Sequence, residues 1–150
     1  MPEQTLADLL FNDQKDATKA KDRFRLSVIR MLRAELQNSS IAKKAPLDTQ
    51  EELTVLTREL KRRQEALGDF EKAGRQDIVE DLKQEIQIIK SYLPKQLEED
   101  ELEKIVIETI KESGAESKRE IGKVMSLLMP RVKGKADGGL VRQIVERNLQ

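Results

Sequence analysis

The apolar residues over positions 79–93 recur at steps of three and four residues, and this spacing constrains the fold most strongly. Such spacing places them on one face of an α-helix, whereas a half-buried strand would need an apolar residue at every second position. A run with heptad spacing covers residues 53–70, with Arg63 where a leucine would fit. Gly74 separates the two runs, and Pro94 follows the second. The pattern predicts two long helices joined by a tight turn, which is an antiparallel helical hairpin.

The residues before the hairpin also have the apolar pattern of helices. Apolar residues recur at helical steps over residues 6–19 and 21–43. Thr49 and Glu52 have the spacing of a capping box, which would start the first hairpin helix. The chain is poor in the aromatic residues that sheets use, with three Phe, one Tyr and no Trp. We therefore predict an all-α fold in which residues 1–95 form a helical bundle that contains the long hairpin.

The helices predicted after Pro94 are shorter than those before it. One ends at Gly114, a second begins at a capping box over residues 117–120, and a third follows the glycine-rich turn 133–139. Three helices of this length are enough for a small domain. We therefore predict that residues 96–150 form a C-terminal three-helix domain.

The sequence contains no cysteine and no histidine. These absences exclude disulfides, thiolate nucleophiles, the Ser-His-Asp triad, the Cys-His pair and the commonest zinc sites. A pair of carboxylates remains able to act as general acid and base, but the 28 acidic residues contain no pair that stands out. We expect no independent catalytic activity, no metal site and no cofactor.

The sequence also suggests where the protein works. No apolar run approaches the roughly 20 residues that a membrane-spanning helix needs. The first four residues lack the basic segment and apolar core of a secretory signal. We expect a cytoplasmic protein that does not bind membranes. The apolar stripe over residues 79–93 has a neighbouring stripe in the same chain, so we interpret it as core and expect a monomer.

Charge is unevenly distributed along a chain whose net charge is zero. Residues 76–116 contain five basic and twelve acidic residues, whereas residues 117–150 contain eight basic and three acidic residues. This asymmetry suggests that the C-terminal third meets an anionic partner. The alternative is that the acidic middle and the basic end of the chain pair with each other. Both interpretations stay open at this point.

Basic residues and glycines meet just before the last predicted helix. Asp137 is placed to cap that helix, and Gly138 and Gly139 would form its first turn. A helix N-terminus attracts phosphate through its free N–H groups and its dipole. The alternative is a flexible connector with solvated lysines, and the charge of Asp137 counts against phosphate. The basic residues that precede it at alternating positions are Arg131, Lys133 and Lys135.

A second basic group lies on the first hairpin helix and includes Arg58, Arg62 and Arg63. Acidic residues such as Glu59 and Glu65 are interleaved with it. We interpret this group as a solvated helix face with salt bridges. The scarcity of aromatic residues leaves no platform on which bases would stack, which argues against sequence-specific binding of single strands.

Four segments of the chain resemble the GatB/YqeY family, and in particular its stand-alone bacterial YqeY-type proteins. They follow the order and spacing of the family's motifs, although Glu98 stands where the family often has a Ser or Thr cap. The segments are LTVLTRELK (53–61), YLPKQL (92–97), GKVM (122–125) and MPRVKGKADG (129–138). The resemblance implies a helical bundle followed by a smaller helical domain. It also implies kinship with the tail domain of the B subunit of the glutamine-dependent tRNA amidotransferase.

In that enzyme the tail domain holds tRNA by its shape and backbone, while the chemistry takes place elsewhere. The resemblance therefore implies a non-catalytic tRNA-binding module, accessory to amidotransfer or aminoacylation. Its partners would be tRNA and components of an amidotransferase or an aminoacyl-tRNA synthetase. The family-level description, carbon–nitrogen ligase with glutamine as amido-N donor, would be inherited from multidomain relatives. The alternative is a helical protein–protein interaction adaptor with no RNA role. The residues expected to contact RNA are Lys123, Arg131, Lys133, Lys135, Gly138, Gly139 and Arg142.

Overall fold

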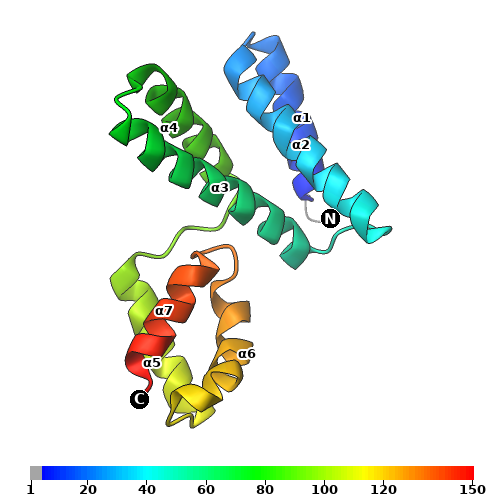
Figure 1. The fold of residues 1–150 in the computed structure, drawn as a ribbon. Coiled ribbons are helices and arrows are strands. Elements are labelled where there is room, and N and C mark those ends of the chain that lie inside the picture. The colour runs from blue at the N-terminus through cyan, green and yellow to red at the C-terminus, as the bar shows by residue number, and fades with distance from the viewer. Residues whose placement is uncertain (1–4) are drawn as a thin grey trace. The chain divides into compact units, whose positions relative to one another are not determined.

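The computed structural model describes residues 5–150, which form seven α-helices, one short 3₁₀-helix and no strand (Figure 1). The predicted all-α class is confirmed. Contacts divide the chain into two compact units, and the boundary lies between Leu93 and Pro94. That these units are independent domains stays a prediction. No helix in the described range is long and apolar enough to cross a membrane.

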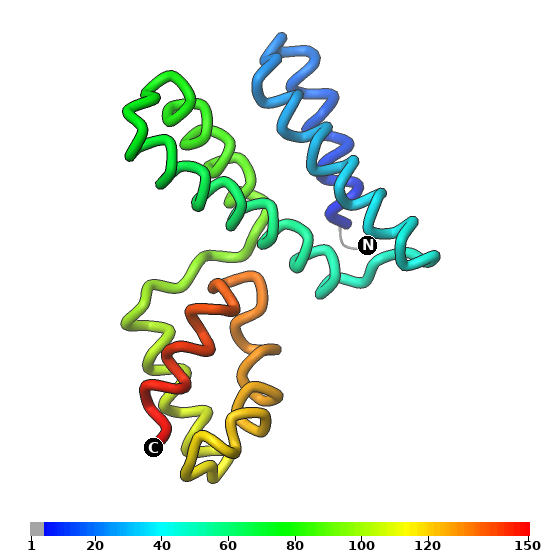
Figure 2. The backbone as a smooth tube through the Cα atoms, in the orientation of Figure 1, coloured from blue at the N-terminus to red at the C-terminus, as the bar shows by residue number. Residues whose placement is uncertain are grey.

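The first unit contains two helical hairpins, which can be followed in Figures 1 and 2. Helices α1 and α2 pack against each other in the first hairpin, and α3 and α4 pack in the second, which is the predicted one. Side chains from all four helices, such as Leu10, Ile29, Leu56 and Ile89, belong to one core cluster. That the four helices close into a bundle stays a prediction. The helices are α1 (Leu6–Lys19), α2 (Arg23–Lys43), α3 (Thr49–Lys72) and α4 (Gln76–Lys90).

The capping box of α3 lies one residue earlier in the sequence than predicted. Asp48, not Thr49, is the N-cap, and its carboxylate accepts a hydrogen bond of 2.8 Å from the Glu51 N–H. The Glu51 carboxylate in turn accepts a hydrogen bond of 3.0 Å from the Asp48 N–H. The prediction of Thr49 and Glu52 was wrong because aspartate caps as well as threonine does, and the sequence offered both pairs.

The second unit contains α5 (Glu99–Ser113), α6 (Ile121–Val132) and α7 (Gly138–Asn148). Fully buried side chains from these helices, including Leu102 and Ile144, form a core cluster of their own. The second predicted capping box is wrong. Ser117 makes no capping hydrogen bond, and Lys118–Glu120 forms a 3₁₀-helix instead. The Glu120 carboxylate accepts a hydrogen bond of 2.7 Å from the Glu116 N–H instead of the Ser117 N–H that a capping box would use, and α6 begins at Ile121.

Candidate nucleic-acid interface

The loop between α6 and α7 places two lysines on either side of a buried glycine. Gly134 has a φ of +78°, a left-handed conformation that side-chain-bearing residues rarely adopt. Lys133 is half-buried and Lys135 is exposed. The Lys135 N–H donates a hydrogen bond of 2.8 Å to the Val132 carbonyl, which closes the turn directly after α6. This hydrogen bond and the left-handed Gly134 give the loop a compact turn directly after α6.

The first turn of α7 continues this loop. Asp137 caps the helix as predicted, since its side chain accepts a hydrogen bond of 3.4 Å from the Leu140 N–H. Gly138 and Gly139 follow in the first turn, and both are exposed. The first N–H groups of a helix have no carbonyl to bind within the helix. These two glycines thus present backbone N–H groups next to the lysines of the loop.

The other basic residues of the predicted site lie elsewhere. The Arg131 guanidinium donates a hydrogen bond of 3.0 Å to the Thr109 hydroxyl and forms an ion pair with Glu112, so Arg131 faces α5. Arg142 pairs with Glu146 at 3.2 Å along α7. Lys123 is exposed on α6, ten residues before Lys133 and therefore roughly 15 Å away along the helix. Of the predicted site, Lys133, Lys135, Gly138 and Gly139 lie close together along the chain, in the α6–α7 loop and the first turn of α7.

Part of the charge asymmetry is balanced within the chain. Arg131 pairs with Glu112, and Arg147 lies 3.6 Å from Glu99 and 3.3 Å from Glu103, so arginines of the basic segment do pair with the acidic segment. The remaining basic residues of positions 117–150, apart from Arg142, form no ion pair with any residue that the structure describes. They are Lys118, Arg119, Lys123, Lys133 and Lys135.

The charge cluster in α3 is only partly a solvated face: Arg58 and Arg62 are exposed and paired with acidic residues as interpreted, whereas Arg63 is mostly buried. Glu59 is only 3% exposed. Its carboxylate lies 3.2 Å from a guanidinium nitrogen of Arg62 and 2.8 Å from one of Arg63. Arg63 also lies 3.5 Å from the Glu85 carboxylate of α4. The signal in the sequence was Arg63 at a heptad core position, because a charge there needs a buried partner.

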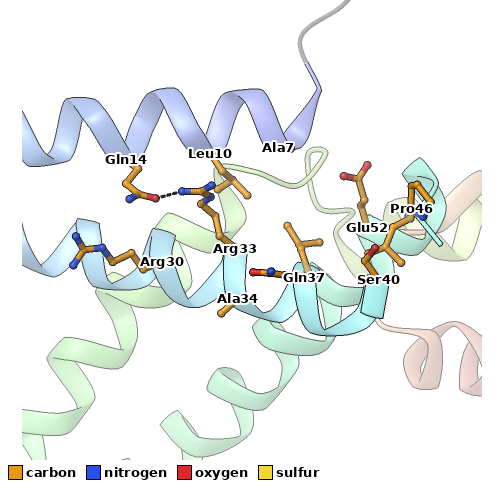
Figure 3. Close-up of a pocket in the computed structure, with 12 residues that line it drawn as sticks. Ala7, Leu10, Gln14, Arg30, Arg33, Ala34, Gln37, Ser40, Pro46 and Glu52 are labelled. Atoms are coloured by element: carbon orange, nitrogen blue, oxygen red, sulfur yellow. Dashed lines mark hydrogen bonds between the residues drawn. The ribbon is translucent and has the colours of Figure 1, made fainter. Parts of the chain in front are cut away.

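The first unit also contains a hollow that the sequence did not predict. Its volume is about 710 Å³, and α1, α2 and the start of α3 line it (Figure 3). Leu10 contributes to an apolar floor, and Arg33 donates a hydrogen bond to the Gln14 side chain at its wall. Glu52 lies at the opposite end, where burial and the nearby Asp48 carboxylate raise its pKa. Among the residues described, no group of three or more acidic side chains is arranged to hold a metal ion.

Known proteins resemble nearly the whole chain. The sequence matches the family described as Yqey-like protein over residues 7–149. It is 30% identical over 141 residues to "Altered inheritance of mitochondria protein 41, mitochondrial" of Pyrenophora tritici-repentis, which covers 90% of this chain and 75% of that protein. It is 42% identical over 67 residues to the E subunit of the glutamyl-tRNA(Gln) amidotransferase of Sulfurisphaera tokodaii. That match covers 42% of this chain but only 10% of the amidotransferase polypeptide.

Proposed function

The chain belongs to the Yqey-like protein family, and we propose that it is a tRNA-binding helical module without catalytic activity of its own. The observation that carries this proposal is the loop between α6 and α7. Lys133 and Lys135 flank a buried glycine there, have no acidic partner among the described residues, and precede the exposed first turn of α7. Ammonium groups and free backbone N–H groups are the donors that bind phosphate.

We propose that this loop holds the tRNA backbone and carries little sequence information. Lysines bind phosphate as point charges, and contacts to phosphate and sugar fix the position of an RNA without reading its bases. Lys123 would make a separate contact about three helical turns away. Arg131 and Arg142 would contribute less, because each would first have to leave an ion pair in the protein.

The proposed role is accessory to amidotransfer or to aminoacylation. The likeness to part of a glutamyl-tRNA(Gln) amidotransferase polypeptide supports an amidotransferase context. Components of such an enzyme, or an aminoacyl-tRNA synthetase, would supply the chemistry. We further propose that the chain acts in the cytoplasm as a monomer, because the apolar stripe of α4 packs into the core of its own unit.

The salt dependence of tRNA binding tests the proposal. Each phosphate contact that is lost flattens the slope of log affinity against log salt by roughly 0.7–0.9. We expect Lys133→Ala/Lys135→Ala to lower the slope for total tRNA by up to about 1.8 and to weaken binding at low salt. The matched control, Lys104→Ala/Lys111→Ala, removes the same charge from exposed positions of α5 and should leave the slope near that of the wild type. Equal slopes for the wild type and the loop variant would refute the proposal.

The hollow in the first unit favours a second candidate function, a helical adaptor that binds a protein and has no RNA role. Grooves between helices accept amphipathic helices from partners. Under this alternative, Ala34→Arg at the exposed wall of the hollow would abolish capture of a partner. Lys133→Ala/Lys135→Ala would leave that capture intact, and the wild type would not bind tRNA.

A further inference from the structure

We infer that Gln96 is a positioning residue that fixes the conformation of the lysine loop, residues 133–135, for binding. This inference rests on the proposed function of that loop. Gln96 lies just before α5, 38 residues away from Gly134 in the sequence. Its side-chain nitrogen donates a hydrogen bond of 2.6 Å to the Gly134 carbonyl and one of 3.0 Å to the Pro94 carbonyl. A side-chain amide has two N–H donors, and here both have a partner.

A backbone hydrogen bond reinforces this contact. The Leu97 N–H donates to the Lys135 carbonyl at 2.8 Å. Two consecutive residues, Gln96 and Leu97, thus bind two consecutive carbonyls of the lysine loop. Both residues are half-buried, which shields these hydrogen bonds from competing water. The segment before α5 therefore acts as a short clamp on the backbone of the loop.

The clamp determines where the two lysines project. Lys133 and Lys135 are joined through Gly134, and glycine is the residue with the largest backbone freedom. Without the clamp, the hydrogen bond from the Lys135 N–H to the Val132 carbonyl would be left to hold the loop, and the freedom regained around Gly134 would cost conformational entropy on binding. A loop that folding has already ordered loses less conformational entropy on binding and therefore binds more tightly. Gln96 would therefore act on affinity through the loop, without touching the RNA itself.

The chemistry at position 96 indicates which substitution isolates this role. Glutamate would bring an acceptor against two carbonyl oxygens, and lysine would add a charge. Gln96→Met keeps the length and the neutral charge of the side chain but removes both N–H donors. The matched control is Gln143→Met, at an exposed position of α7 in the same unit.

Hydrogen exchange in the free full-length protein tests the clamp without RNA. We expect Gln96→Met to accelerate exchange of the Leu97 amide, whereas the amides of Val124 and Leu128 in the core of α6 keep their wild-type protection. Gln143→Met should change neither. Unchanged exchange at Leu97 would overturn the inference, and so would faster exchange throughout α6, which would show that Gln96 stabilises the whole unit.

Binding of total tRNA then tests positioning. We expect Gln96→Met to bind on the order of three- to tenfold more weakly, with an unchanged salt slope because no charge is removed. A faster-exchanging loop with wild-type affinity would overturn the positioning role while the proposed function stands. If the wild type itself fails to bind tRNA, the proposed function fails and the positioning role is overturned with it.

Discussion

Glu59 is a buried carboxylate held by arginines, so its removal should cost stability. Glu59→Gln leaves Arg63 mostly buried with only Glu85 as a counterion. Breaking a buried ion pair from one side costs about 3–5 kcal/mol, and the remaining Glu85 reduces that cost. We expect urea unfolding to show a loss of about 2 kcal/mol or more. Glu65 is exposed on the same helix and serves as the control, since Glu65→Gln should change stability by less than about 0.5 kcal/mol. Equal losses for Glu59→Gln and Glu65→Gln would contradict a buried role for Glu59.

The environment of Tyr92 predicts that the stability of the protein falls at alkaline pH. Its hydroxyl donates a hydrogen bond of 2.5 Å to Asp13, and burial together with that carboxylate raises the pKa of Tyr92 to about 12. Because folding raises this pKa, Tyr92 contributes to the free energy of unfolding. That contribution is complete below the pKa of the unfolded state, near 10, and is lost as the pH rises to 12. After allowance for solvent screening, we expect a loss of about 1 kcal/mol over this window.

Comparison with Tyr92→Phe isolates this effect from the titration of the lysines. The variant should be less stable than the wild type at pH 7 by about 1 kcal/mol, because it lacks the hydrogen bond to Asp13. Chemical unfolding at a series of pH values should show the difference shrinking between pH 10 and 12. A constant difference across that range would contradict the raised pKa.

At the scale of elements, two glycines of the second unit should respond oppositely to alanine. Gly114 ends α5 with a φ of +72°, so Gly114→Ala strains the backbone even though the space around it is open. Gly122 lies inside α6, and no atom would obstruct a methyl group there. We expect thermal unfolding to show Gly114→Ala less stable by about 1 kcal/mol and Gly122→Ala more stable by about 0.5–1 kcal/mol. The same sign for both changes would contradict these assignments.

Sequence patterns located the helices and several of their ends, because helix ends depend on local residues, although both predicted capping boxes were wrong. Gly74 and Gly114 have positive φ values where turns were expected, and Asp137 caps α7 as predicted. Partnerships between distant residues were not predictable. The contact between Arg131 and Glu112 spans 19 residues and depends on how α6 packs against α5. The clamp by Gln96 was missed for the same reason.

At the scale of the whole molecule, the second unit should fold on its own. Among the residues that the structure describes, its core cluster draws on positions 97 to 149. We expect a fragment of residues 94–150 to be helical by circular dichroism and to melt cooperatively, although a unit of this size has a small margin of stability. A fragment without helical signal at about 10 °C, where folded domains are close to their maximum stability, would contradict the division of the chain into independent domains.

Under the proposal, the arginines of the basic segment stabilise the second unit through ion pairs, while its unpaired lysines remain available for phosphate. The two kinds of basic residue would then have separate roles, which the uneven distribution of charge along the sequence did not reveal.

The most direct test is an NMR titration of the isotope-labelled full-length protein with total tRNA at low salt. We predict that the largest changes in amide resonances fall on residues 133–139, with a smaller group around Lys123. Changes confined to α1 and α2, or no changes at low salt, would contradict the proposal that the lysine loop binds tRNA.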